Sequence, residues 1–152
     1  MTSKTSYTNI STDIQSFIST YGESALQEAM QQYIDGQQEY ICKTKSYTSI
    51  IKIRDIYYLE IKEHNITVHT NHGTYKKYGA LNHELTILSP YGFIKCNQSC
   101  IVSLSKIRTI QNDDIILIND TILHISRLYA PKLLAAFNRK IYSSASHHNA
   151  KK

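Results

Sequence analysis

The sequence predicts a mainly β domain that follows a short helical segment at the N-terminus. The spacing of apolar residues changes at Glu39 from a helical repeat to an alternation with a period of two. Tyrosine dominates the aromatic residues, with 12 Tyr against 3 Phe and no Trp, and tyrosine favours strands. Asn, Asp and Gly recur between the apolar runs, where hairpin turns need them. A chain of 152 residues is long enough for one such domain and a short appendage.

The net charge of +5 is unevenly distributed along the chain. Residues 1–39 hold one Lys and five acidic residues, a net charge of −4. Residues 40–152 hold 16 Lys and Arg and seven acidic residues, a net charge of +9. A basic body favours an anionic partner, either a nucleic acid or a membrane surface, and a solvated basic surface without a partner is the alternative.

Composition and motifs argue against several classes of protein. No apolar run has the length of a membrane span, and the N-terminus lacks a signal peptide, so we expect a cytoplasmic protein without membrane contact. Three cysteines without a CxxC pair indicate reduced thiols. No GxSxG, Walker or HExxH motif is present, and His69-x-x-His72 lacks a third ligand at a supporting spacing. We therefore expect no enzyme, no metal and no cofactor.

Residues 1–38 form the predicted N-terminal helical segment. Its first ten residues are polar and are expected to be disordered. Capping boxes at Thr12 and Ser24, with Gly22 between them and Gly36 as a stop, predict two short helices or one kinked helix. The apolar stripe of these helices either covers one edge of the following sheet, or forms a dimer contact or a docking site for a regulatory protein.

The β domain is expected over residues 39–142, followed by a flexible tail at 143–152. Segment 56–61 is apolar almost throughout, as a central strand covered on both faces would be. Gly73 supplies the positive φ of a tight hairpin turn. Short helices are expected at 80–88 and 129–142. Alternation and turn residues predict extended segments at 40–44, 47–53, 56–61, 66–70, 74–78, 93–95, 100–104, 107–111, 114–118 and 121–126.

Three polar loops end or interrupt apolar strands of this domain. They contain His64, Asn97-Gln98-Ser99 and Ser126-Arg127. Gln and Arg can engage two atoms on one base edge, while His and Ser suit single contacts to bases or phosphates. Lysines and arginines that could neutralise phosphates lie near the loops in the sequence: Lys62, Lys76, Lys77, Lys95, Lys106 and Arg108.

Several blocks of sequence together resemble the LytTR-type DNA-binding domain of bacterial transcription regulators. The blocks are 55–60, 78–81, 93–102, Ile107 with Ile110, and 125–127, and the resemblance covers about residues 40–142. It implies an elongated, mostly antiparallel fold of about ten strands with short flanking helices. It also implies loops that enter successive major grooves of duplex DNA, often at direct repeats.

The resemblance places base contacts on His64, Gln98 and Arg127. Contacts to the DNA backbone are expected from the neighbouring polar residues Lys62, Asn65, Lys76, Lys77, Lys95, Asn97, Ser99 and Ser126. The sequence departs from the usual central block at Asn97, Cys100 and Ser103, so a different operator is expected.

About 40 residues precede the β body, too few for the receiver domain that family members commonly carry, so we expect a stand-alone regulator. The alternative is a module that binds single-stranded nucleic acid, with tyrosines stacking on bases, or one that binds protein. Cys96, which follows Lys95, is expected to be a packing residue, and an oxidisable thiol is the alternative.

Overall fold

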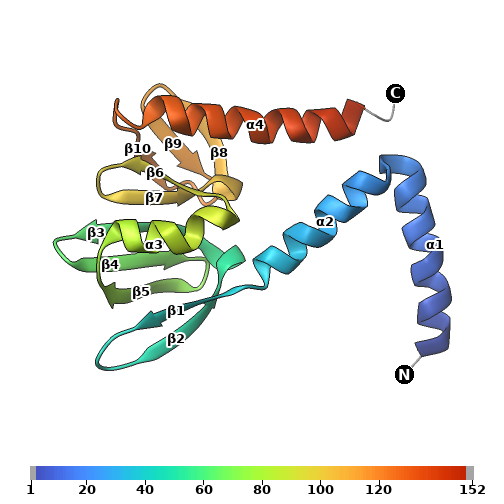
Figure 1. Cartoon of the computed structure of the whole chain (residues 1–152), viewed down its shortest axis with the longest axis horizontal. Coiled ribbons are helices and arrows are strands. Elements are labelled where there is room, and N and C mark those ends of the chain that lie inside the picture. Colours follow the sequence, from blue (N-terminus) through green and yellow to red (C-terminus); the bar gives the residue numbers. More distant parts are fainter. Residues whose placement is uncertain (1–2, 150–152) are drawn as a thin grey trace. The chain divides into compact units, whose positions relative to one another are not determined.

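The computed structural model describes the backbone of residues 3–149 and the side chains of residues 9–141. The chain divides into two units, residues 35–138 and residues 1–34 together with 139–152 (Figure 1). Within the described residues, no helix is both long enough and apolar enough to cross a membrane.

The N-terminal unit contains α1, Ser3–Tyr21, and α2, Glu23–Gly36. Gly22 separates them with a φ of 95°, and its N–H donates to the Ile18 carbonyl at 2.8 Å, as a glycine after a helix C-terminus does. Of the two predicted alternatives, two short helices or one kinked helix, the structure has two helices. However, α1 begins nine residues before Thr12, within the segment that was expected to be disordered. Neither Gly nor Pro interrupts the sequence from Ser3 to Tyr21, and its Ser and Thr residues are tolerated in a helix.

Apolar side chains of both N-terminal helices are exposed. No residue of α2 is buried, and Met30, Tyr33 and Ile34 are each more than half exposed. Ile10 and Ile14 of α1 are also exposed. The helical stripe is therefore not core within the described residues.

The β unit has ten strands in three antiparallel sheets, which confirms the predicted fold class. The central sheet has the order β5-β4-β3-β7-β6, and the flanking sheets have the orders β1-β2 and β10-β9-β8. The strands are β1 Glu39–Lys43, β2 Thr48–Lys52, β3 Ile56–Lys62, β4 Asn65–Thr70, β5 Gly73–Tyr78, β6 Phe93–Asn97, β7 Cys100–Ser103, β8 Ile107–Gln111, β9 Asp114–Leu117 and β10 Ile122–His124.

Turn residues occupy the positions that the sequence predicts. Gly73 has a φ of 125°, and Asn112 and Asp120 have φ values of 57° and 71° at the turns on either side of β9. Glu63 is a further residue with positive φ, at 61°, in the two-residue turn between β3 and β4. The short side chains of Asn and Asp tolerate this conformation better than Glu does.

Helices and 3-10 turns connect the sheets. The helices are α3, Leu81–Leu88, and α4, Ala130–Asn149. The latter continues seven residues beyond the predicted end at Tyr142, and the flexibility of the tail stays a prediction. Three 3-10 turns that the sequence did not predict lie at Ile53–Asp55, Ser89–Tyr91 and Leu104–Lys106.

The central sheet separates two hydrophobic cores. Leu59 and Ile101 face one core, together with residues of β1, β2 and α3. Val102 and Tyr58 face the other, together with residues of the β8–β10 sheet and α4. All four positions of β7 are consequently buried, because both faces of this strand are covered. The central position of β3 agrees with the apolar character of its sequence.

A buried polar cluster links β1, β5 and α3. The Glu84 side chain is 2% exposed, and its Oε1 accepts hydrogen bonds from the Tyr40 hydroxyl and, at 2.8 Å, from the Lys77 ammonium. The ammonium also lies 4.6 Å from the centre of the Tyr40 ring. Burial and the neighbouring carboxylate raise the pKa of Tyr40. No local sequence pattern indicates this cluster, because its members are 7 to 44 residues apart.

The three free thiols are buried, which makes their reactivity a test of the fold. Cys42 and Cys96 are fully buried and Cys100 is 5% exposed. Burial raises the pKa of Cys42, and a hydrogen bond with Cys96 together with burial raises that of Cys100, whereas the same hydrogen bond lowers the pKa of Cys96. Because a thiol must be accessible as well as ionised to react, and Cys96 is fully buried, we expect a soluble thiol reagent to label the native protein slowly at pH 8. Labelling of all three thiols should become fast in denaturant, and fast native labelling of Cys96 would contradict its packing role.

Candidate nucleic-acid interface

Three loops of the β unit lie at one end of the scaffold, at the left in Figure 1. They are the β3–β4 turn with His64, the β6–β7 turn with Gln98, and the β10–α4 segment with Arg127. The first two are neighbours because β3 pairs with β7, and the Ile61 N–H donates to the Ser99 carbonyl at 3.0 Å. Strands β3, β6 and β10 all end on this side, so the fold brings together loops that are 29 or more residues apart. We call this the loop end.

The second and third loops are joined by hydrogen bonds. The Ser126 N–H donates to the Cys96 carbonyl at 3.0 Å, and the Asn97 Nδ2 donates to the His124 carbonyl at 2.8 Å. The Tyr129 hydroxyl donates to Gln98 Oε1, also at 2.8 Å. Gln98 and Arg127 are therefore held on one connected framework.

The predicted base-contacting residues are accessible at this end. His64, Gln98 and Arg127 are all exposed. The His64 ring lies 5.5 Å from that of Tyr78. Next to Arg127, Leu128 is 80% exposed, which no sequence pattern indicated. The structure thus exposes both the polar side chains that can read base edges and an apolar side chain beside them.

Asn97 supports this framework from inside. Its Oδ1 accepts hydrogen bonds from the Ser99 N–H at 2.9 Å and the Ser99 hydroxyl at 3.2 Å, while its Nδ2 donates to the His124 carbonyl. The amide that was predicted to contact the DNA backbone is thus engaged within the protein. The fold gives Asn97 the role of positioning the Gln98 turn against the β10–α4 segment.

Replacing Asn97 with alanine should therefore loosen the loop end. We expect a loss of about 1–2 kcal/mol in the free energy of unfolding, because three hydrogen bonds disappear and the His124 carbonyl loses its partner. Specific DNA binding should fall at a temperature where the protein is still folded.

Asn119→Ala is the matched control for this change, because Asn119 Oδ1 accepts from the Thr121 N–H at 3.1 Å in the turn before β10, at the opposite end. Equal losses of DNA binding in the two variants would show that Asn97 does not position the Gln98 turn for DNA binding.

The other predicted backbone contacts differ in their surroundings. Lys62, Asn65 and Ser99 are exposed at the turns, and Lys76 is exposed with its Nζ 2.8 Å from Thr67 Oγ1. Lys95 lies 5.6 Å from the centre of the Tyr129 ring. The Ser126 carbonyl accepts from the N–H groups of Tyr129 and Ala130 and so caps the start of α4.

Lys77 is the exception among the predicted backbone contacts. Its side chain is 15% exposed, and its ammonium bonds to Glu84 and, at 3.3 Å, to the Ile41 carbonyl. An ammonium that is paired with a buried carboxylate cannot neutralise a phosphate without leaving that carboxylate unpaired. The contact predicted for Lys77 stays a prediction, and this pairing disfavours it, since the alternation of β5 turns Lys77 inward and Lys76 outward.

Lys106 and Arg108 lie away from the loop end. Lys106 is the last residue of the 3-10 turn after β7, at the end of this strand that is remote from the Gln98 turn. Its ammonium lies 5.0 Å from the centre of the Tyr57 ring. Burial lowers its pKa. Arg108 pairs with Asp120 at 2.7 Å, next to the turn between β9 and β10. Lys106 and Arg108 are thus near the polar loops in the sequence but distant from them in the folded domain.

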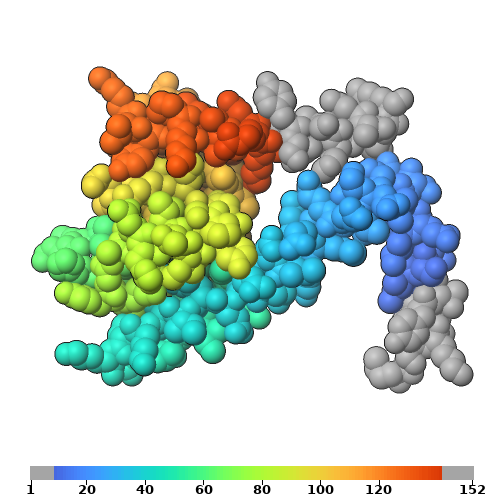
Figure 2. All heavy atoms as spheres, viewed as in Figure 1, coloured from blue at the N-terminus to red at the C-terminus, as the bar shows by residue number. Residues whose placement is uncertain are grey.

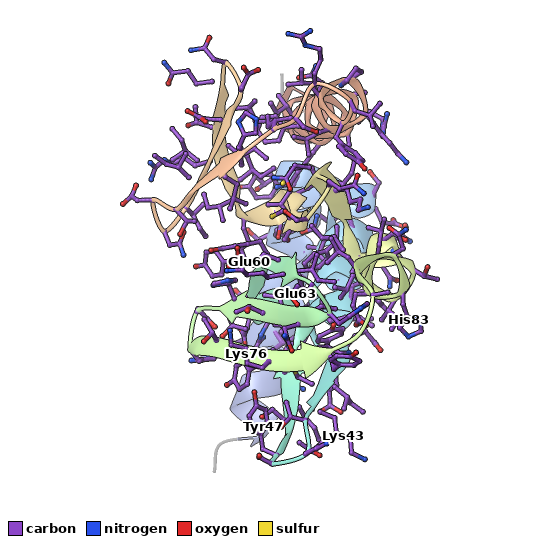
Figure 3. The ribbon with its side chains drawn as sticks, turned by 90° about the vertical axis from the view of Figure 1, so that its left-hand side faces the viewer. Lys43, Tyr47, Glu60, Glu63, Lys76 and His83 are labelled. Atoms are coloured by element: carbon purple, nitrogen blue, oxygen red, sulfur yellow. The ribbon has the colours of Figure 1, made fainter. Side chains whose placement is uncertain are left out.

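Exposed acidic residues also lie at the loop end: Glu63 in the β3–β4 turn, and Asp113 with Asp114 at the β8–β9 turn, where the Asp113 carbonyl accepts from the Ile125 N–H at 2.7 Å. Glu63 precedes His64 at the tip of the β3–β4 turn, and Figure 3 shows it on this side of the molecule with Lys76. A carboxylate here repels phosphates. Glu63→Gln should strengthen binding to any duplex about twofold to fivefold at low salt, the range expected for one exposed charge. Unchanged affinity for random duplex DNA would place Glu63 away from the DNA backbone.

Fold and loop end together define a β scaffold that presents polar and basic loops to an anionic partner. The chain belongs to the LytTR family: the model of the LytTr DNA-binding domain matches residues 46–138. A solved structure, the LytTr DNA-binding domain of a Bacillus cereus response regulator, superimposes with a TM-score of 0.58 at 25% sequence identity. The match covers 65% of this chain and 98% of that domain. Among curated proteins, none matches the sequence. The family resemblance predicted from the sequence is confirmed.

Proposed function

We propose that this protein is a sequence-specific regulator of transcription that binds double-stranded DNA in the bacterial cytoplasm. The observation that carries the proposal is the loop end, where His64, Gln98 and Arg127 are exposed on three connected loops of a LytTR domain. The surrounding body, residues 40–152, has a net charge of +9, which favours association with DNA phosphates.

The three exposed side chains have different capacities. Arg127 can donate two hydrogen bonds to one guanine. Gln98 can donate from Nε2, and its Oε1, already bonded to Tyr129, retains a second lone pair. Tyr129 thereby fixes the orientation in which Gln98 meets an adenine. His64 suits a single contact. Phosphates are assigned to the polar groups around them: Lys62, Asn65, Lys76, Lys95, Ser99 and Ser126.

A binding assay on duplex and single strands of one sequence tests the proposal. The sequence is taken from genomic fragments that the protein selects. We expect the duplex to bind more tightly, with a slope of log K against log salt of about −0.9 for each neutralised phosphate. Tighter binding to the single strands would favour the alternative of a single-strand module, and a slope near zero would exclude DNA as the partner.

The N-terminal helices are proposed to join a second copy of the chain, so that two domains occupy a direct repeat. Their apolar residues are exposed, and segment 1–39 has a net charge of −4, which disfavours contact with DNA. Deleting residues 1–34 should leave binding to one half-site intact and weaken occupancy of paired sites. If the shortened protein still occupies paired sites cooperatively, the helices do not form the contact, and a regulatory protein becomes the preferred occupant.

A further inference from the structure

We propose that the tip of the β1–β2 hairpin, residues 43–47, binds DNA phosphates beyond the base pairs that the His64 loop reaches. This inference rests on the proposed function and extends the interface with a fourth contact. The family model matches the chain from residue 46 onward, so all of β1 and the first two residues of its connection to β2 lie outside the match.

The hairpin tip lies at the loop end of the β unit. A cleft of about 470 Å³ separates it from β4 and β5, and Asn65, the residue after His64, belongs to this cleft. Its lining comprises Thr44, Lys45, Asn65, Lys76, Lys77 and Tyr78. Figure 2 shows the tip projecting on the same side as the β3–β4 turn, and Figure 3 shows Lys43, Tyr47 and Lys76 on that side.

The tip is held in place before any ligand arrives. The Tyr47 hydroxyl accepts from the Lys76 N–H at 2.7 Å, and the Cys42 thiol donates to the Lys76 carbonyl at 3.0 Å. Within the turn, Thr44 Oγ1 accepts from the N–H groups of Ser46 and Tyr47, both at 3.1 Å. A preorganised tip loses little conformational freedom when it binds, so its charges contribute more fully to affinity.

The chemistry of the cleft suits a phosphate. Among the described residues, no carboxylate lines it, whereas three lysines do, and the charge of Lys77 is already offset by Glu84. Lys45 and Lys76 are exposed cationic donors, and Lys43 is exposed beside them. The Thr44 and Tyr78 hydroxyls and the Asn65 amide are neutral donors to phosphate oxygens. A base edge would need acceptors and donors in a fixed plane, which flexible lysines do not provide.

The order of the strands sets the distance to this contact. The loops and the tip follow one another as Arg127, Gln98, His64 and Lys45, because β1 contacts β5 at the edge of the central sheet. Paired strands lie about 4.8 Å apart and packed sheets about 10 Å apart, and β1 belongs to a separate sheet beyond β5, so the tip lies about 10–17 Å beyond the His64 turn. With a rise of about 3.4 Å per base pair, this distance equals about three to five base pairs of flanking duplex.

The experiment compares duplexes that carry the selected site with or without five extra base pairs on either flank. For the wild-type protein, extension on one flank should raise the affinity, and extension on the other should not. Lys43→Ala with Lys45→Ala should remove that gain, about fivefold, and reduce the salt slope on the extended duplex by about 1.8, the value for two phosphates. The preference for the selected sequence over a scrambled one should not change.

Lys52→Ala is the matched control, because Lys52 lies in the same hairpin at its opposite end, paired with Glu39 at 3.7 Å. It should keep the gain from extension. If the wild-type protein prefers the selected duplex but neither flank matters, or if the double variant keeps the gain, this inference is overturned and the proposed function stands. If the wild-type protein shows no preference for the selected duplex, the proposed function itself fails.

Discussion

Glu84→Leu should lower the free energy of unfolding by about 3 kcal/mol, the largest effect we expect from a single side chain in this protein. The substitution leaves the Lys77 ammonium and the Tyr40 hydroxyl without their shared acceptor, and breaking a buried pair costs about 3–5 kcal/mol. The lower end applies because the Lys77 side chain retains 15% exposure and can turn partly toward water. Urea unfolding followed by circular dichroism measures the loss.

A double variant separates the uncompensated charge from the lost packing. Glu84→Leu combined with Lys77→Met replaces the pair with apolar groups, and such replacements are often close to neutral. We therefore expect the double variant to be more stable than Glu84→Leu alone. Tyr40→Phe, which removes one hydrogen bond only, should cost about 1 kcal/mol. Additive effects of the Glu84 and Lys77 substitutions would show that the two residues are not coupled.

Arg127→Ala should weaken binding to the selected duplex tenfold or more and leave binding to random duplex nearly unchanged. A bidentate contact from Arg to guanine contributes about 1–3 kcal/mol of discrimination. Gln98→Ala should relax the preference at a different base pair, and His64→Ala should have a milder effect because its contact is single. Binding to a panel of duplexes with single base-pair changes measures each preference.

Lys76→Ala is the comparison that separates base contacts from phosphate contacts. It should weaken all duplexes by a similar factor and reduce the salt slope by about 0.9. The exposed loop variants should stay within about 0.5 kcal/mol of the wild-type stability, so that lost binding does not report unfolding. If Arg127→Ala weakens selected and random DNA equally, Arg127 contacts the backbone and the base assignment is wrong.

The strands and turns of the β unit follow from local sequence. The alternation in residues 39–126 gives the strands, and Asn112, Gly73 and Asp120 lie at the turns where their positive φ is needed. The start of α1 was predicted less well. The capping box at Thr12 lies inside this helix, because a capping pattern is a preference that a continuous run without Gly or Pro can override.

By itself, the sequence determined the order and type of the elements, the basic charge of the body and the family, because each depends on residues close together in the chain. Only the tertiary structure decided which strands became neighbours. That pairing turned Lys77 toward Glu84 and committed the Asn97 amide to His124. It also carried the β1–β2 tip to the side of His64, next to Asn65. Whether a lysine or an amide is free for DNA depends on the partners that distant segments bring to it, and no local pattern encodes them.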